Sequence, residues 1–196
     1  MKHLTILIAA MLVSLTMAAQ QATYDDDFTQ TRLIKASGKT VSKAGHMVFD
    51  GKESLAMTYT EPAGEYFIVE GKKVKMNLNG KKGEVDANKV KSVGLQRTTL
   101  LNCLAGNWEE AAKANNAKSE VSDGKGTRTI TLKANGKVPR GGYASVELIY
   151  RTKDGKLTKM VLEEAAGIVN TYELARCEAR RRNSWAAGSI RASGKS

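Results

Sequence analysis

Histidine and cysteine, which supply many catalytic nucleophiles, proton carriers and metal ligands, are scarce in this sequence. Its 196 residues include two histidines and two cysteines. His3 lies near the N-terminus, and nothing in the sequence marks a nucleophile that would pair with the other histidine, His46. No histidine or cysteine belongs to a cluster with the spacing of metal ligands. The composition therefore argues against an enzyme and predicts neither a metal site nor a cofactor.

Acidic side chains are the remaining candidates for chemistry, and their pattern is that of a solvated surface. The adjacent glutamates at 109–110 and 163–164 could exchange protons with a substrate, but neighbouring acids usually face solvent. The run Asp25-Asp26-Asp27 could bind a hard cation such as calcium. We expect instead that this run is a disordered acidic tail. His46 alternates with Met47, so we expect the histidine on the exposed face of a strand.

The sequence also lacks an apolar run long enough to span a bilayer, which takes roughly 20 residues. The longest run, Leu4 to Leu15, follows the positive Lys2 and precedes the small residues that a signal peptidase requires. We therefore predict a signal peptide at residues 1–19, cleaved near Ala18 or Ala19. No cysteine follows it that could be lipidated. The short, simple form favours a bacterial protein, and the signal peptide by itself leaves a periplasmic location and full secretion both open.

Acidic residues are clearly fewer than basic residues in this sequence. Lys and Arg total 31 against 20 Asp and Glu, a formal net charge of +11. Such a surplus favours anionic surfaces, although lysines on strands and turns also simply keep a β protein soluble. Export argues against nucleic acid as a partner. Part of the surplus lies in a basic C-terminal tail at 176–196, which contains Trp185 and Ile190 and could touch an anionic membrane transiently or remain a frayed, soluble end.

The two cysteines have two interpretations. In an oxidising compartment Cys103 and Cys177 could form a disulfide. Cys103 lies in an apolar stretch, Leu100 to Leu104, where a free thiol would also fit as a small buried hydrophobe. The sequence leaves both interpretations open.

Turn signals and alternating apolar residues predict one mainly β domain with a few helices (α+β), over residues 20–175. Asn-Gly and Asp-Gly pairs recur through the chain, and the segments between them alternate, as in Val74 and Met76 against Lys75. We expect an antiparallel sheet curled around its apolar face. The segment from Asn88 to Leu104 has helical spacing with Gly106 placed to end it, and a short second helix is expected from Trp108 to Asn116. These helices would form a lid.

Five stretches carry a resemblance to a known family. They are Phe28 to Arg32, Gly45 to Phe49, Leu55 to Pro62, Phe67 to Gly71 and Val74 to Met76. In their order and spacing they resemble the LolA family of periplasmic lipoprotein carriers: an F-x-Q motif, a Gly-led strand, a strand that ends in Tyr-x-x-Pro, and a strand that runs into a Gly turn. The clearest similarity covers residues 28–86. The later part resembles the branch found in Bacteroidetes-type bacteria.

The resemblance implies an incomplete β-barrel with a helical lid and an apolar interior for the acyl chains of lipoproteins. Its partners would be acylated lipoproteins, an inner-membrane export complex and an outer-membrane acceptor. An exported protein that binds another lipid or hydrophobic ligand is the alternative, and a structural envelope protein is a third. In better-studied members an Arg-Pro pair follows the Gly-led strand, and its Arg is thought to latch the lid. Gly51-Lys52 stand at those positions here.

Nine large apolar residues at strand spacing are the candidate lining of this interior. Ordinary packing in a closed core is the competing role for each of them. They are Met47, Phe49, Leu55, Met57, Tyr59, Phe67, Val69, Val74 and Met76.

Overall fold

The computed structural model describes residues 22–175. The predicted signal peptide, the basic tail and Cys177 lie outside the described residues. The secondary structure is, in chain order, β1 (Tyr24–Ile34), β2 (Lys39–Phe49), β3 (Ser54–Glu61), β4 (Ala63–Glu70), β5 (Lys73–Leu78), β6 (Lys81–Asp86), α1 (Lys91–Ala105), α2 (Trp108–Ala114), β7 (Ala117–Gly124), β8 (Thr127–Ala134), β9 (Tyr143–Arg151), β10 (Leu157–Glu164) and β11 (Ile168–Ala175).

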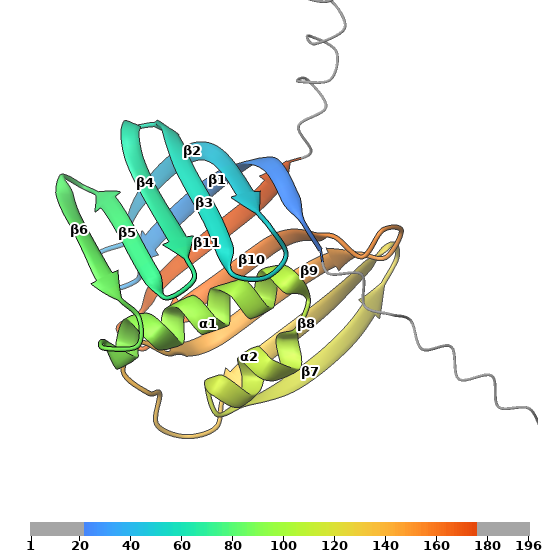
Figure 1. The fold of residues 1–196 in the computed structure, drawn as a ribbon. Helices are drawn as coiled ribbons and strands as arrows, with labels where there is room; N and C mark the ends of the chain where they lie inside the picture. Colours follow the sequence, from blue (N-terminus) through green and yellow to red (C-terminus); the bar gives the residue numbers. More distant parts are fainter. Residues whose placement is uncertain (1–21, 176–196) are drawn as a thin grey trace, which may run out of the picture.

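All eleven strands belong to one antiparallel sheet, in the order β6-β5-β4-β3-β2-β1-β11-β10-β9-β8-β7. Every neighbour in the sheet is also a neighbour in the chain except β1 and β11, which join the first and last strands at the centre. The sheet curls without closing, and α1 runs along its open side (Figure 1). The predicted fold class, an incomplete antiparallel barrel with helices, is confirmed.

Cross-strand pairing explains why the alternating apolar residues share one face. Met57 of β3 lies opposite Met47 of β2 and opposite Phe67 of β4. Phe67 in turn lies opposite Met76 of β5. Because directly opposite residues project from the same face, the register places all nine predicted residues on the concave side of the sheet. The polar residues between them face outward.

The two predicted helices are present, with boundaries close to the expected ones. Gly106 ends α1 in a left-handed conformation (φ 82°), and its amide contacts the last carbonyls of the helix. The C-terminal half of α1 is buried, and Cys103 is fully buried within it. The hydroxyl of Tyr150 donates a 2.9 Å hydrogen bond to the carbonyl of Cys103. Helix α2 packs on α1, β7 and β8.

The expectation of an acidic tail at Asp25-Asp26-Asp27 was wrong, because these residues form part of β1. The side chains of Asp25 and Asp27 project outward, toward β2, and each has an oxygen close to the ring of His46. Nε2 lies 2.7 Å from Asp25 and Nδ1 lies 2.9 Å from Asp27. The histidine does lie on the outer face, as predicted, but the two carboxylates cover much of it.

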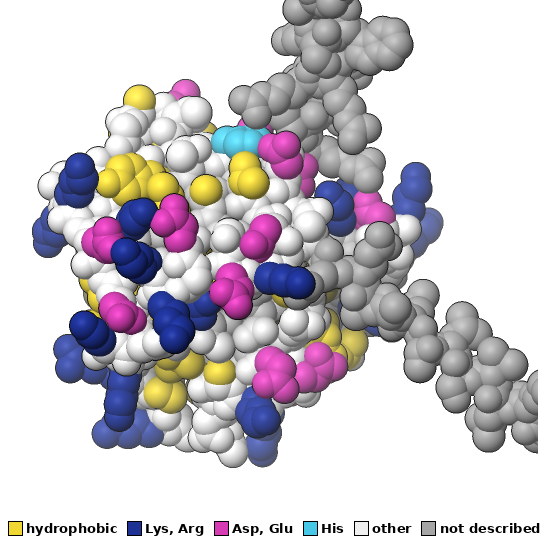
Figure 2. All heavy atoms as spheres, viewed as in Figure 1, with side chains coloured by type: hydrophobic (Ala, Val, Ile, Leu, Met, Phe, Trp, Pro, Cys, Tyr) yellow, Lys and Arg dark blue, Asp and Glu magenta, His cyan; other side chains and the backbone are white. Residues whose placement is uncertain are grey.

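Charges of both signs are interspersed on the face seen in Figure 2, with small apolar patches between them. Within residues 22–175 no group of three His, Cys, Asp or Glu side chains could hold a metal ion. No helix in the same range is long and apolar enough to cross a membrane.

Candidate functional site

A cavity of about 430 Å³ opens on the concave side of the sheet, bounded on one side by α1. Its size lies in the range of small-molecule binding sites. The lining combines apolar with polar and charged side chains. The residues are Gln30, Arg32, Ile34, Lys39, Val41, Lys43, Met57, Tyr59, Phe67, Leu78, Asn79, Gln96, Leu100, Tyr143, Leu162, Glu164, Asn170 and Tyr172.

Three of the nine predicted lining residues, Met57, Tyr59 and Phe67, face this cavity. The other six pack in or against the hydrophobic core. They are Met47, Phe49, Leu55, Val69, Val74 and Met76. Their part in binding acyl chains stays a prediction.

A hydrogen-bond network centred on Gln30 forms the polar part of the cavity wall. The hydroxyl of Tyr59 donates to Gln30 Oε1 at 2.8 Å. Gln30 Nε2 donates to Asn170 Oδ1 at 3.3 Å and to the hydroxyl of Tyr172 at 3.1 Å. Asn170 Nδ2 then donates to Glu164 Oε1 at 3.3 Å. A buried polar group is costly unless its hydrogen bonds are made, so this network stabilises a polar surface inside an otherwise apolar interior.

The network explains two of the motifs that carried the family resemblance. Gln30 is the last residue of the F-x-Q motif, and Tyr59 begins the Tyr-x-x-Pro motif. The ring of Phe28 contacts that of Tyr59 edge to face, with centroids 5.3 Å apart. The two motifs therefore meet in space, through one hydrogen bond and one aromatic contact.

The third motif, the Gly-led strand, is explained by the same aromatic ring. Gly45 lies directly opposite Phe28 in the sheet. A Cβ atom at Gly45 would lie 2.9 Å from the Phe28 ring and 2.4 Å from the carbonyl oxygen of Thr58. No side chain fits there without a shift of the backbone. Glycine at this position leaves room for the Phe28 ring beside β2.

Tyrosine hydroxyls in and around the cavity stay protonated at neutral pH. Burial raises the pKa of Tyr59 and of Tyr143. Burial also raises the pKa of Tyr172 to about 12, an increase that the nearby Arg32 guanidinium partly offsets. A protonated hydroxyl is a hydrogen-bond donor. The hydroxyl of Tyr59 already donates to Gln30, whereas that of Tyr172 accepts from Gln30 and can donate its own proton to a ligand.

Three cations reach the cavity, and one of them is already paired. Lys43 forms an ion pair with Glu65, a hydrogen bond with Asn79 Oδ1 and a contact over the ring of Tyr59. Burial alone would raise the pKa of Glu65, but bonds from Lys43 and the Asn79 amide hold it below its usual range. Within residues 22–175, the side chains of Arg32 and Lys39 have no hydrogen-bonded or ion-paired partner.

The lid helix is held by an arginine of its own. Arg97 Nε of α1 donates a 2.5 Å hydrogen bond to the carbonyl of Gly71 in the turn between β4 and β5. Gly51-Lys52, at the position of the family's Arg-Pro pair, lies in the β2–β3 turn, where the Asp50 carboxylate accepts bonds from the backbone amides of residues 52–54. The restraint on α1 is therefore a hydrogen bond from an arginine of the helix itself to a backbone carbonyl in the β4–β5 turn.

Sequence reasoning missed most of the polar lining. Gln30 and Arg32 were overlooked as lining residues, although they continue the alternation of Phe28 along β1, because a polar side chain on an alternating strand is normally assigned to the solvent face. The alternation along β1 was the signal that could have placed both residues on the concave face. Asn170 had no such signal, because its place depends on the pairing of β11 with β1.

The disulfide prediction stays untested. Cys103 is a free thiol among the described residues, and burial raises its pKa to about 12. Its proposed partner, Cys177, lies outside them.

Comparison of the sequence with curated proteins gave no match. Among solved structures, the LolA superfamily protein NE2245 from Nitrosomonas europaea is 10% identical, with 80% of this chain and 85% of that chain covered and a TM-score of 0.36. The lipoprotein LppX from Mycobacterium tuberculosis is 12% identical, with 77% and 85% covered and a TM-score of 0.33. A putative outer membrane lipoprotein-sorting protein domain from Vibrio parahaemolyticus is 10% identical, with 77% and 83% covered and a TM-score of 0.35.

The family comparison covers most of the sequence. The family described as "Outer membrane lipoprotein carrier protein LolA" matches residues 19–184. The match includes all thirteen helices and strands of the described structure and the whole lining of the cavity. The chain belongs to the LolA family of outer membrane lipoprotein carrier proteins.

Proposed function

We propose that this protein is a periplasmic carrier that takes acyl chains of lipoproteins into the concave cavity and carries them from the inner to the outer membrane. Its partners on this route are an inner-membrane export complex and an outer-membrane acceptor. The observation that carries the proposal is the partly apolar cavity of about 430 Å³ beside α1 in a chain of the LolA family.

The physical need for such a cavity follows from the cost of exposing an acyl chain to water. At about 0.8 kcal/mol per methylene, a 16-carbon chain gains on the order of 12 kcal/mol when it is fully buried. An acylated protein therefore does not cross an aqueous space unaided. A cavity that shields the chain and opens to solvent provides the route.

The volume of the cavity sets how much of a ligand this conformation accommodates. A methylene occupies roughly the volume of a water molecule in the liquid, about 30 Å³, so a 16-carbon chain requires on the order of 480 Å³. The cavity thus fits about one chain. A lipoprotein with three chains requires movement of α1, which the Arg97 bond to Gly71 opposes. The same volume favours the second candidate, a carrier of single-chain lipids.

Two valines of β2 provide a matched test. Val41 lines the cavity, whereas Val48 is on the opposite face of the same strand. Both are exposed, at 38% and 47%, so a larger side chain is tolerated at either position. Tryptophan at position 41 would occupy space that two or three methylenes of a ligand need. We expect Val41→Trp to weaken acyl binding by about 10-fold to 50-fold, and Val48→Trp to leave it unchanged.

Displacement of an apolar fluorescent dye by a triacylated lipopeptide is the measurement, with the same peptide lacking acyl chains as the ligand control. Displacement by the acylated peptide alone, weakened in Val41→Trp and unchanged in Val48→Trp, supports carriage of lipoproteins. If a single-chain lipid displaces the dye and the triacylated peptide does not, the second candidate is correct. If neither the dye nor any acylated ligand binds, the proposal fails.

A further inference from the structure

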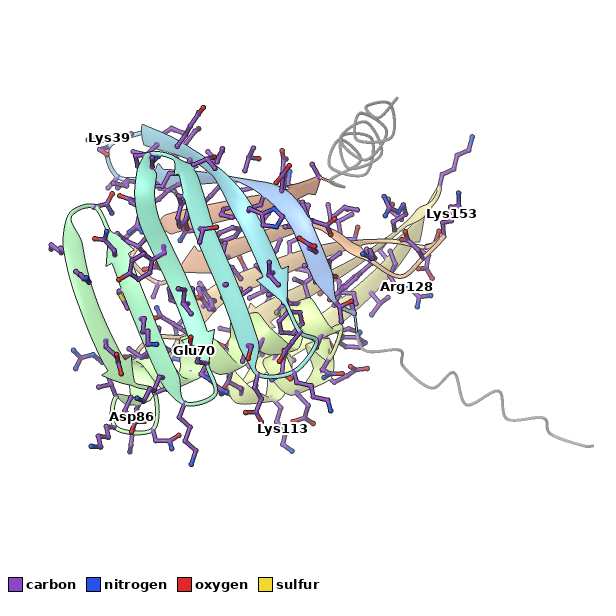
Figure 3. All side chains as sticks on the ribbon, turned by 45° about the horizontal axis from the view of Figure 1, so that its top comes forward. Lys39, Glu70, Asp86, Lys113, Arg128 and Lys153 are labelled. Atoms are coloured by element: carbon purple, nitrogen blue, oxygen red, sulfur yellow. The ribbon has the colours of Figure 1, made fainter. Side chains whose placement is uncertain are left out.

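The mouth of the cavity carries positive charge that the protein itself does not neutralise. Arg32 is half-buried on the concave face of β1, and Lys39 begins β2. Figure 3 shows Lys39 at the end of the curled sheet opposite to Glu70 and Asp86. Both cations line the cavity. Within residues 22–175, neither side chain has a hydrogen-bonded or ion-paired partner.

The register of β1 and β2 places the two cations on one face, close together. Arg32 is paired with Val41, and Ile34 is paired with Lys39. Arg32 and Lys39 are therefore diagonal neighbours across the strand pair, with Cα atoms roughly 7 to 8 Å apart, within reach of long side chains. Ile34 and Val41 are the other two residues of this group of four neighbours, so both cations lie directly beside apolar lining residues.

The other charged groups of the cavity have partners. Lys43 is paired with Glu65. Glu164, the single acid in the lining, accepts a hydrogen bond from Asn170. The amide of Asn170 is neutral and does not offset the charge of a carboxylate, so among the described residues the lining carries two unpaired cations, Arg32 and Lys39, against the one acid Glu164. The net positive charge attracts an anion, and the attraction is stronger at the half-buried Arg32 than at the exposed Lys39, because water screens an exposed charge. A guanidinium also matches the paired oxygens of a carboxylate or phosphate in geometry.

We infer that the cavity selects acyl ligands that carry an anionic headgroup, a carboxylate or a phosphate, with Arg32 and Lys39 holding that group while the chain lies against the apolar lining. This inference rests on the acyl-binding part of the proposed function and specifies its second candidate, the carrier of single-chain lipids, because the ester- and amide-linked acyl chains of a lipoprotein carry no anionic headgroup. It adds the orientation of the ligand, with the headgroup at the Lys39 end of the sheet and the chain directed toward Met57, Phe67 and Leu100. It also adds a basis for selection, because neutral lipids leave both cations unsatisfied.

The test measures dye displacement from the mature protein by three ligands with the same 16-carbon chain: palmitate at pH 8, lysophosphatidic acid and the neutral monopalmitoylglycerol. We expect one or both anionic ligands to bind about 10-fold or more tightly than the neutral one, since hydrogen bonds to charged groups are the stronger ones. A preference confined to palmitate identifies the carboxylate as the ligand group. A preference confined to lysophosphatidic acid identifies the phosphate.

Arg32→Gln keeps a polar side chain and removes the charge, so it should reduce the preference for the anionic ligands over the neutral one, with Lys39 as the remaining cation. Arg32→Lys should restore part of it. The matched control is Arg128→Gln, because Arg128 pairs with Asp123 on the β7–β8 hairpin, remote from the cavity. Equal affinity for all three lipids in the wild type, or a full preference in Arg32→Gln, overturns the inference. If none of the three lipids binds, the proposed acyl-binding function fails with it.

Discussion

The packing of Phe28 against Gly45 makes a sharp prediction about stability. In the variant Gly45→Ala, the added methyl group would lie 2.4 Å from the backbone oxygen of Thr58 and 2.9 Å from the Phe28 ring. The oxygen belongs to the paired strand β3 and has little freedom to retreat. The methyl group must therefore push β2 away from β3 or tilt the ring. Either movement disturbs the contact of Phe28 with Tyr59 in the cavity wall.

The magnitude follows from two opposing effects. Overpacking of a filled interior costs typically 1–3 kcal/mol. Replacing glycine by alanine returns about 0.4–1 kcal/mol, because the unfolded chain loses conformational freedom. We expect Gly45→Ala to lower the free energy of unfolding by about 1–2 kcal/mol, which corresponds to a decrease of roughly 2–8 °C in the melting temperature of a domain of this size.

Gly83 in β6 provides the matched control. It is also a strand glycine without a positive φ, and a Cβ atom there would meet nothing within 4 Å. Gly83→Ala should therefore be neutral or slightly stabilising. Urea unfolding of the two variants and the wild type, followed by circular dichroism, gives the comparison. If Gly45→Ala is as stable as Gly83→Ala, the close packing of Phe28 on Gly45 does not exist in solution, and our explanation of the Gly-led strand is incorrect.

Two further predictions concern the lid and the response to alkali. Arg97→Ala removes the hydrogen bond from α1 to the carbonyl of Gly71, so amide hydrogen exchange within α1 should accelerate about 10-fold. The control variant Lys91→Ala, at the exposed start of α1, should have little effect on this exchange. Equal exchange rates in the two variants would show that Arg97 does not restrain the helix. Burial raises the pKa of Cys103 to about 12 and also raises those of the buried tyrosines above 10. The folded state therefore holds these protons more tightly than the unfolded state, and this stabilisation is fully present below about pH 9 and lost as the pH rises toward 12. A free energy of unfolding, measured in urea, that stayed constant between pH 9 and pH 11 would contradict the burial of these groups.

Local sequence patterns predicted most of the fold. Alternation along β2 to β5 identified the residues of the concave face, and helical spacing with Gly106 located α1. These patterns succeed because a residue's neighbours at i+2 or i+4 decide which face it occupies, whatever the rest of the chain does. The same local reasoning failed for the acidic run at 25–27, because strand formation there depends on pairing with β2.

The candidate site depended more on distant pairing. The nine apolar residues were chosen from the N-terminal half, yet only Met57, Tyr59 and Phe67 line the cavity. Much of the remaining lining comes from β1 and from the C-terminal strands. The spacing of apolar residues in the sequence does not show which of them fill the core and which line the cavity. The difference depends on how closely α1 approaches the sheet.

The strands, the apolar face of the sheet and the glycine, phenylalanine and glutamine motifs that indicate the family all follow from local sequence. What these motifs build depends on how distant strands pair. Gln30 and Asn170 are 140 positions apart, and they meet because β1 pairs with β11 at the centre of the sheet. The pairing of β1 with β2 places Arg32 opposite Val41, beside the apolar lining. Alternation is a property of adjacent residues, whereas a polar wall in a cavity is a property of strands that the chain brings together from its two ends.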